Sequence, residues 1–216
     1  MCIRDSYRTR NRRKKLIGII DYGLGNVQSF INSYRLLGLE AIQVKEKKHI
    51  EICERFILPG VGSFDAALSK LEASGLLPDL EKTVLIDNLP ILGVCVGLQI
   101  LSRKSEEGTK KGLGWLKADV KLIKKSKGLP IPHMGWNTVF VKQHNSNLMA
   151  NIESKRFYFL HSYHVVMDSI EDQIAVSNYG SEITAVANNN NVYGCQFHPE
   201  KSHSDGLKVL ENFARL

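Results

Sequence analysis

The sequence predicts an α/β fold with a mostly parallel sheet flanked by helices and an additional antiparallel strand region in the second half. In the first half, short apolar runs alternate with segments of helical periodicity, which is typical of parallel strands joined by helices. The second half instead holds strand-like runs separated by turn residues. The length of 216 residues is sufficient for one domain with a full hydrophobic core.

The first half opens with LIGIID at 16–21, an apolar run that predicts a buried parallel strand. Residues 27–38 carry apolar side chains at helical spacing and end at Gly38, where we expect a helix to stop. A short charged helix should follow the next strand. The further elements expected here are strands 41–45, 56–59 and 90–94 and helices 65–75, 81–88 and 95–106.

The second half predicts a series of strands and a closing helix. It contains no internal repeat and no linker between domains, so residues 15–216 are expected to form a single domain. The strand-like segments are 118–125, 138–143, 157–167, 173–180, 183–189 and 192–197, and the closing helix is 205–216.

The net charge of +7 is concentrated at the beginning of the chain. The first fifteen residues carry seven Lys or Arg and one Asp, which leaves about +1 for the rest. A nearly neutral body argues against nucleic-acid binding. Residues 1–14 have no apolar core of a secretory signal and no apolar stripe of a transit peptide. We expect them to be a disordered or non-native basic extension. No apolar run is long enough to cross a membrane.

The four cysteines form no CxxC pair and no zinc-binding spacing. They are Cys2, Cys53, Cys95 and Cys195. Without a secretory signal, we expect reduced thiols and a cytoplasmic protein. Cys195 lies in the strand-like run VYGCQF and is expected to be a core residue, and the same is expected of Cys53.

Cys95 stands between Gly93 and Gly97 in the pattern G-x-C-x-G, at the junction of a predicted strand and a predicted helix. This is the cysteine form of the nucleophile elbow, in which a sharp turn exposes the nucleophile and leaves little room for neighbouring side chains. The start of the following helix favours a thiolate and offers backbone N–H groups to an oxyanion. A buried cysteine between two packing glycines is the alternative.

His198 and Glu200 follow the last apolar strand in the segment FHPE. Pro199 disfavours helical backbone at His198, and in extended chain residues i and i+2 face the same side. Glu200 can then orient the imidazole of His198, which would act as the base for Cys95. The alternative is a strand-end histidine beside a solvated glutamate.

Two other patterns in the sequence could indicate a cofactor site or a metal site. The turn at Gly23 and Gly25 lacks the third glycine of a dinucleotide loop, because Gln28 occupies that place, so no cofactor is expected. His161 and His164 are three residues apart on a predicted strand and would point to opposite faces, so no metal site is expected.

Seven motifs, in order over nearly all of residues 16–216, resemble the class I (triad-type) glutamine amidotransferases. Within that class they are most similar to the glutaminase subunit of imidazole glycerol phosphate synthase. They are IIDYGLGNVQS (19–29), LPGVGSF (58–64), GVCVGLQ (93–99), KGLGW (111–115), PHMGWN (132–137), FYFLHSY (157–163) and GCQFHPEKS (194–202).

The resemblance implies a flavodoxin-like fold and a role for several of the motif residues. Cys95 would attack the side-chain amide of glutamine to give a thioester and ammonia, with His198 moving the proton and Glu200 orienting it. The backbone of Val61 and Val96 would form the oxyanion hole. The residues that would hold L-glutamine are Gly62, Gln99, His161, Ser162 and Tyr163.

The resemblance also implies a partner, a cyclase of (β/α)₈-barrel fold. The cyclase would take the ammonia and make imidazole glycerol phosphate and an aminoimidazole carboxamide nucleotide in histidine biosynthesis. Trp136 and Asn137 would face this partner in a heterodimer.

Three alternatives remain at this point. His164 and His203 are unusual for the family and resemble paralogues that supply ammonia to surface-sugar synthesis. A stand-alone γ-glutamyl hydrolase and a catalytically silent binding subunit are the other two.

Overall fold

The computed structural model describes residues 16–152 and 154–216. The basic extension expected at 1–14 lies outside these residues. The first half contains β1 (Ile17–Ile20), α1 (Val27–Leu36), β2 (Ala41–Val44), α2 (Lys47–Ile50), β3 (Arg55–Gly60), α3 (Phe64–Ala73), α4 (Leu77–Glu81), the π-helical turn Lys82–Ile86, β4 (Ile91–Cys95) and α5 (Val96–Ile100).

The second half contains mostly strands. They are β5 (Ala118–Leu122), β6 (His133–Val141), β7 (Ser154–His161), β8 (Tyr163–Met167), β9 (Gln173–Asn178), β10 (Glu182–Asn189) and β11 (Val192–Cys195), with 3₁₀ turns at Ile170–Asp172 and Pro199–Lys201 and the final helix α6 (His203–Arg215).

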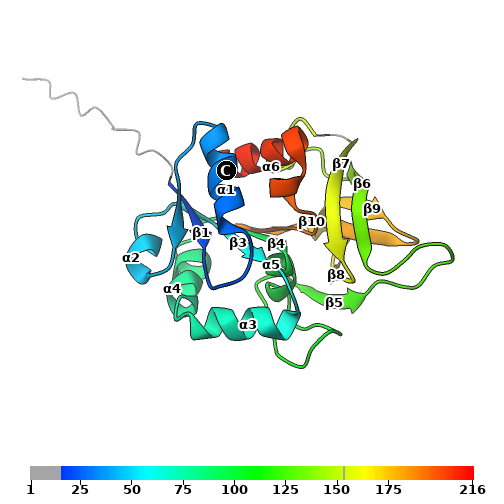
Figure 1. Cartoon of the computed structure of the whole chain (residues 1–216), viewed down its shortest axis with the longest axis horizontal. Helices are drawn as coiled ribbons and strands as arrows, with labels where there is room; N and C mark the ends of the chain where they lie inside the picture. The colour runs from blue at the N-terminus through cyan, green and yellow to red at the C-terminus, as the bar shows by residue number, and fades with distance from the viewer. Residues whose placement is uncertain (1–15, 153) are drawn as a thin grey trace, which may run out of the picture.

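Nine strands form one sheet in the order β2-β1-β3-β4-β11-β10-β9-β6-β7, and β5 and β8 form a separate antiparallel pair (Figure 1). From β2 to β11 every neighbouring pair is parallel, and from β11 to β7 every pair is antiparallel. The predicted fold class is therefore confirmed. The consequence for the site is that β11, formed late in the chain, lies beside β4.

Helices cover both faces of the parallel region. In Figure 1, α1 and α6 lie on one side of the sheet, and α3, α4 and α5 lie on the other. The four central strands of this region are almost completely buried, as expected for parallel strands with helices on both faces. Within the described part of the chain, no helix is long and apolar enough to cross a bilayer.

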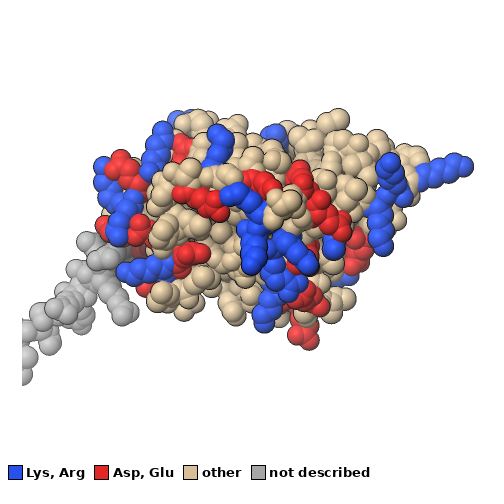
Figure 2. Space-filling model, turned by 90° about the horizontal axis from the view of Figure 1, so that it is seen from below, with Lys and Arg blue, Asp and Glu red and all other residues tan. Residues whose placement is uncertain are grey.

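Charged side chains are mixed by sign on the surface. Figure 2 shows Lys and Arg interspersed with Asp and Glu over one face of the molecule. Several are paired, including Arg103 with Asp168 at 2.7 Å and Lys110 with Glu72 at 2.6 Å. This face therefore lacks the single-sign basic field that nucleic-acid binding needs.

Several predicted elements differ from the structure, and two of the differences affect the site. The helix expected at 95–106 ends at Ile100, because the following residues pair with later segments through bridges such as Ser105 with Val120. The strand expected at 157–167 is interrupted at Ser162, whose carbonyl accepts from the N–H of Ile123. Residues before the break belong to the large sheet and residues after it to the small one.

A buried arginine joins β3 to the end of α6. Arg55 is 3 % exposed, and its guanidinium donates to the carbonyls of Phe213 and Ala214 at 3.0 and 2.6 Å. These carbonyls lie in the last turn of the helix, where a cation is favourable and the regular i+4 donors of the helix are missing.

Replacing Arg55 with Met should lower the free energy of unfolding by about 2 kcal/mol, because the carbonyls at the end of α6 lose a charged donor in a buried place. Urea denaturation measures this change. Arg35→Met, at an exposed position on α1, is the matched control and should have little effect. Equal stability of the two variants would contradict the proposed role of Arg55.

Candidate active site

Cys95 occupies a strained turn between β4 and α5. Its backbone has φ 55° and ψ −111°, a left-handed φ that costs a non-glycine residue on the order of 1–3 kcal/mol. The turn follows the strand directly, with α5 beginning at Val96. Such strain persists only where the surrounding packing imposes it. The turn places the thiol at the carboxyl edge of the parallel strands.

Glycines make this turn possible. A Cβ on Gly97 would lie 1.9 Å from the carbonyl oxygen of Leu58, and one on Gly93 would lie 2.7 Å from that of Gly97. The sequence pattern predicted this crowding. It did not predict that Gly60, on the neighbouring strand β3, is equally required: a Cβ there would lie 2.2 Å from the backbone nitrogen of Gly97.

His198 reaches the turn from β11. That strand runs parallel to β4 with Cys195 opposite Val94, so the chain leaves β11 at the same edge where Cys95 stands. The backbone N–H of His198 donates to the carbonyl of Tyr158 at 2.9 Å. Its own carbonyl accepts from the hydroxyl of Ser202 at 2.6 Å. These contacts fix the backbone that carries the imidazole.

Glu200 contacts the imidazole as predicted, but through a different backbone. Nδ1 of His198 lies 2.9 Å from Oε1 of Glu200, and both side chains are 4 % exposed. His198 itself is extended, with φ −97° and ψ 96°, whereas Pro199–Lys201 forms a 3₁₀ turn. The expectation of a continuous extended segment was therefore wrong. The turn, and not strand alternation, brings the carboxylate to the ring.

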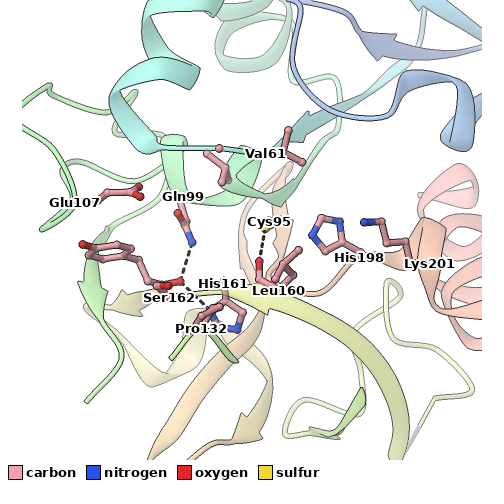
Figure 3. A pocket seen from close by; sticks show the side chains of 13 residues that line it. Val61, Cys95, Gln99, Glu107, Pro132, Leu160, His161, Ser162, His198 and Lys201 are labelled. Carbon is pink, nitrogen blue, oxygen red and sulfur yellow. Dashed lines mark hydrogen bonds between the residues drawn. The ribbon is translucent and has the colours of Figure 1, made fainter. Parts of the chain in front are cut away.

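The pKa of His198 is raised to about 9. Burial acts in the opposite direction and lowers it, but interaction with Cys95 and with the Glu200 carboxylate outweighs the burial. In Figure 3 the imidazole of His198 lies beside Cys95 in one pocket. The geometry is that of a thiol, an imidazole and an orienting carboxylate in series.

The pocket around Cys95 has a volume of about 260 Å³ (Figure 3). Nine of the residues singled out in the sequence line it: Val61, Gly62, Cys95, Val96, Gln99, His161, Ser162, Tyr163 and His198. They come from the ends of β3, β4 and β11 and from the residues around the break between β7 and β8. Ligand sites of open α/β sheets gather at such strand ends.

Val61 and Val96 are neighbours because β3 and β4 are in register, with Gly60 opposite Cys95. Each valine is the next residue after its strand, and both line the pocket beside the thiol. Gly62 follows with φ 85°, a conformation suited to glycine. Two adjacent strand ends thus bring together the two backbones expected to form the oxyanion hole.

Gln99 is held in the wall of the pocket by hydrogen bonds of its side chain. Its amide nitrogen donates to the carbonyl of Tyr163 at 2.8 Å and to Oε1 of Gln196 at 3.2 Å. The amide nitrogen of Gln196 in turn lies 3.8 Å from the sulfur of Cys95. The same Tyr163 carbonyl lies 2.9 Å from Nδ1 of His161. These contacts connect the β7–β8 junction to the helix that follows the nucleophile.

Four pocket residues were not singled out in the sequence: Glu107, Pro132, Leu160 and Lys201. Among these four residues Glu107 supplies a carboxylate. Its Oε2 accepts a hydrogen bond from the backbone N–H of Phe64 at 2.8 Å. The predicted helix 95–106 would place Glu107 directly beyond its C-terminal end, twelve residues after Cys95. Because α5 ends at Ile100, the chain turns and carries Glu107 back to the pocket. The local sequence contains no signal for this turn.

Trp136 and Asn137 lie on β6 and do not line the pocket. Trp136 is 38 % exposed, and its ring stacks on that of His203 with centroids 5.1 Å apart. The amide nitrogen of Asn137 contacts Nε2 of His133 at 3.2 Å and the carbonyl of Asn178 at 2.9 Å.

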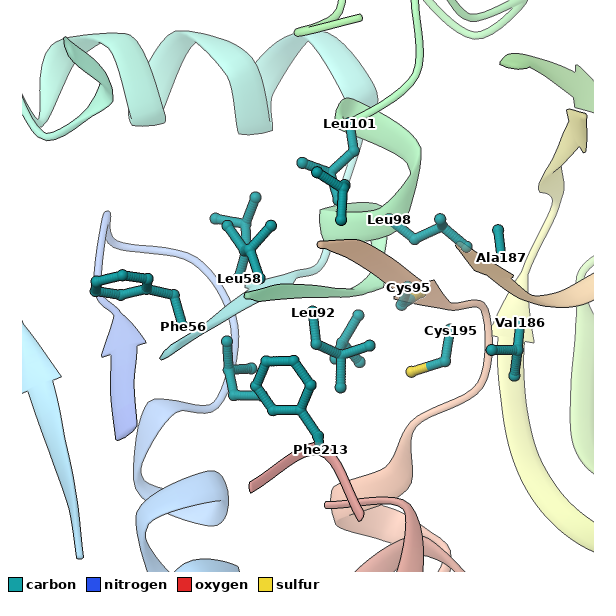
Figure 4. Packing of buried hydrophobic residues seen from close by; sticks show 14 of the residues in the cluster. Phe56, Leu58, Leu92, Cys95, Leu98, Leu101, Val186, Ala187, Cys195 and Phe213 are labelled. Carbon is teal, nitrogen blue, oxygen red and sulfur yellow. The ribbon is translucent and has the colours of Figure 1, made fainter. Parts of the chain in front are cut away.

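Two further cysteines of the described residues lie in the core, and the histidine pair His161 and His164 is divided between two sheets. Cys53 and Cys195 are buried, as predicted, and Figure 4 shows Cys195 among core side chains near Leu92 and Val186. Burial raises the pKa of Cys53 to about 12. His161 and His164 belong to different sheets. In the described residues, no group of three or more His, Cys, Asp or Glu side chains could hold a metal ion.

The family model of class-I glutamine amidotransferases matches residues 18–216. The chain therefore belongs to the class I glutamine amidotransferase family.

Two relatives of this chain carry the same name. The chain is 45 % identical over 205 residues to "Imidazole glycerol phosphate synthase subunit HisH" of Leptospira borgpetersenii, covering 93 % of this chain and 100 % of the relative. It is 44 % identical over 204 residues to the protein of the same name in Leptospira interrogans, again covering 93 % and 100 %.

Solved structures support the same fold. A crystal structure of a glutamine amidotransferase matches with a TM-score of 0.71 at 20 % identity, covering 93 % of this chain and 99 % of that one. The structure of PurLQS from Thermotoga maritima matches with a TM-score of 0.69 at 23 % identity, covering 94 % and 98 %.

Replacing Glu200 with Gln should lower the pKa of His198 from about 9 toward 6.5, because the carboxylate that stabilises the imidazolium is lost. Between these two pH values the wild-type ring stays protonated, whereas the ring of the variant releases its proton. NMR titration of the His198 ring measures the midpoint. Glu106→Gln, which removes an exposed carboxylate, is the control. An unchanged midpoint in Glu200→Gln would show that the carboxylate does not set the charge of the ring.

Proposed function

We propose that this chain is the glutaminase subunit of an imidazole glycerol phosphate synthase of histidine biosynthesis. It hydrolyses L-glutamine to glutamate through a thioester on Cys95 and passes the ammonia to a (β/α)₈-barrel cyclase. Relatives that match this chain over their full length, at 45 % and 44 % identity, are named as a subunit of this synthase. The observation that carries the chemistry is the strained Cys95 beside His198 and Glu200 at the wall of one pocket.

The reaction follows from the order of these groups. The Cys95 sulfur attacks the side-chain amide carbon of glutamine and forms a C–S bond. The oxygen gains negative charge, for which the backbone N–H groups of Val61 and Val96 are the proposed donors. His198 then gives its proton to the amide nitrogen, the C–N bond breaks and ammonia leaves. Water, with His198 as base, attacks the thioester to release glutamate and free the thiol.

Glutamine binding requires groups for a substrate that carries both an ammonium and a carboxylate. Glu107 is the pocket carboxylate, and we assign it to the α-ammonium group of the substrate. Gln99 and the residues His161, Ser162 and Tyr163 would enclose the side chain. Gly62, beside the thiol, would leave room for the substrate backbone.

An exposed apolar strip beside the pocket supports docking of a partner. Met134 on β6 and Leu160 on β7 are paired across the two strands and are 65 % and 39 % exposed. Leu160 also lines the pocket, and Trp136 follows on the same strand as Met134. Large exposed apolar side chains around a polar pocket are typical of an interface. A cyclase docked here would cover the pocket and receive the ammonia without loss to solvent.

The same features support a proposal for the working unit and its location. We propose residues 15–216 as a single glutamine amidotransferase domain, to which a basic segment at 1–14 contributes nothing catalytic. Cys53, Cys95 and Cys195 are free thiols, which is consistent with a cytoplasmic protein.

Cys95→Ala should reduce glutamine hydrolysis by about a thousandfold or more, because the nucleophile is lost. The assay measures glutamate release by this chain with and without the cyclase of the same organism. Cys53→Ala, which changes a buried thiol away from the pocket, should retain activity. The wild-type rate should rise when the cyclase is added. Full activity of the isolated chain would favour a stand-alone hydrolase instead, and turnover by Cys95→Ala would exclude the thioester.

Glu107→Gln should raise the KM for glutamine about tenfold or more with a smaller change in kcat, because the charge that faces the substrate ammonium is removed. The comparison is made with saturating cyclase. Glu106→Gln, one residue earlier and in contact with Lys121 rather than the pocket, is the control. An unchanged KM in Glu107→Gln would remove Glu107 from the substrate site.

A further inference from the structure

His133 lies at the centre of a hydrogen-bond chain that no role above includes. Its Nε2 is 3.2 Å from the amide nitrogen of Asn137, and its Nδ1 is 3.0 Å from Nε2 of His161. Nδ1 of His161 is 2.9 Å from the carbonyl oxygen of Tyr163. The chain thus runs from β6 to the β7–β8 junction, residues 161–163, at the pocket.

The outer end of the chain fixes the direction of its hydrogen bonds. The side-chain oxygen of Asn137 accepts from the backbone N–H of Thr138 at 2.8 Å, so its nitrogen must face Asn178 and His133. That nitrogen can only donate, and Nε2 of His133 therefore accepts. The proton of the His133 ring is then on Nδ1, which donates to His161.

The inner end of the chain requires the same arrangement independently. The carbonyl of Tyr163 can only accept, so Nδ1 of His161 must carry the proton and Nε2 must be the acceptor. That Nε2 is the atom that faces Nδ1 of His133. Both rings are therefore neutral with the proton on Nδ1, and a second proton on His161 would bring two donors together.

Packing holds the His133 ring in this position. It is 2 % exposed and stacked between Phe159 and Tyr179, with centroids at 4.6 and 4.0 Å. Burial lowers the pKa of His133 to about 4 and is also the main reason that the pKa of His161 falls to about 3. Neither ring takes up a proton near neutral pH. The hydrogen bonds therefore keep the same donor-to-acceptor direction from Asn137 to the Tyr163 carbonyl.

The chain ends on a carbonyl that is also an anchor of Gln99. The carbonyl oxygen of Tyr163 accepts from Nδ1 of His161 on β7 and from the amide of Gln99 on α5, the latter at 2.8 Å. Two donors from different elements thus fix the position of this oxygen. Both donors line the pocket. We propose that His133 is a positioning residue that fixes the β7–β8 junction for glutamine binding, through a one-way hydrogen-bond chain from Asn137 to the Tyr163 carbonyl. This proposal rests on the proposed function, because it assigns the junction to glutamine.

The same chain connects the pocket to the proposed docking face. Asn137 is half-buried on β6, next to the exposed Trp136 and on the same strand as Met134. A partner that shifts Asn137 would change the first donor of the chain, and each ring would pass the change inward.

The first test of this proposal is spectroscopic and needs no activity. Long-range ¹⁵N–¹H spectra of the full chain at neutral pH should show His133 and His161 neutral, each with its proton on Nδ1. A proton on Nε2, or on both nitrogens, of either ring would refute the proposed direction of the hydrogen bonds.

The second test is kinetic and uses the protein saturated with the cyclase. His133→Phe keeps a ring between Phe159 and Tyr179 but breaks the chain, and should raise the KM for glutamine about tenfold while kcat changes much less. Tyr179→Phe keeps the ring stacked on His133 and removes only the hydroxyl bonded to Pro130, so it should behave as wild type.

Asn137→Ala tests the chain from its other end. It should raise the KM by a smaller factor, and should add nothing further when combined with His133→Phe, because both remove the same connection. Additive effects, or a wild-type KM in folded His133→Phe, would refute the positioning role. If the wild-type complex hydrolyses glutamine and Cys95→Ala does not, such a result would leave the proposed function intact.

Discussion

The left-handed backbone of Cys95 is the constraint on which the rest of the site depends. The turn costs on the order of 1–3 kcal/mol and is stable only because three glycines leave no side chain between β3, β4 and α5. Gly60, Gly93 and Gly97 come from both strands and the helix. The result is a thiol held at the edge of the sheet, next to the backbone of Val61 and Val96, without a side chain in the way.

The topology of the sheet supplies the remaining groups. Because β11 is placed beside β4, a histidine from near the end of the chain reaches a cysteine from its middle. The antiparallel half of the sheet then brings the β7–β8 junction to the same pocket. Ser202 joins the two, since its hydroxyl donates to the His198 carbonyl and accepts from the N–H of Tyr158 on β7. Cys95, His198 and the first part of the β7–β8 junction are thus positioned by one sheet.

Much of this could be predicted from local patterns, and the limits are physical. The alternation of apolar runs and the G-x-C-x-G spacing indicate the fold and the nucleophile, because both follow from short-range geometry. Gly60 and Glu107 depend on contacts with segments far away in the chain, which spacing does not report. The 3₁₀ turn at Glu200 replaced the expected extended segment, although the predicted contact formed. The neutral pair His133–His161 is visible only once β6 and β7 are adjacent.

The most direct test of the account is to identify the covalent intermediate on the elbow. Rapid acid quenching of the complex during glutamine turnover, followed by mass spectrometry of its peptides, detects a glutamyl group attached to sulfur. The account predicts the adduct on the peptide that contains Cys95, and its disappearance once glutamine is consumed. Turnover without an adduct on Cys95, or with an adduct on Cys53 or Cys195, would contradict it.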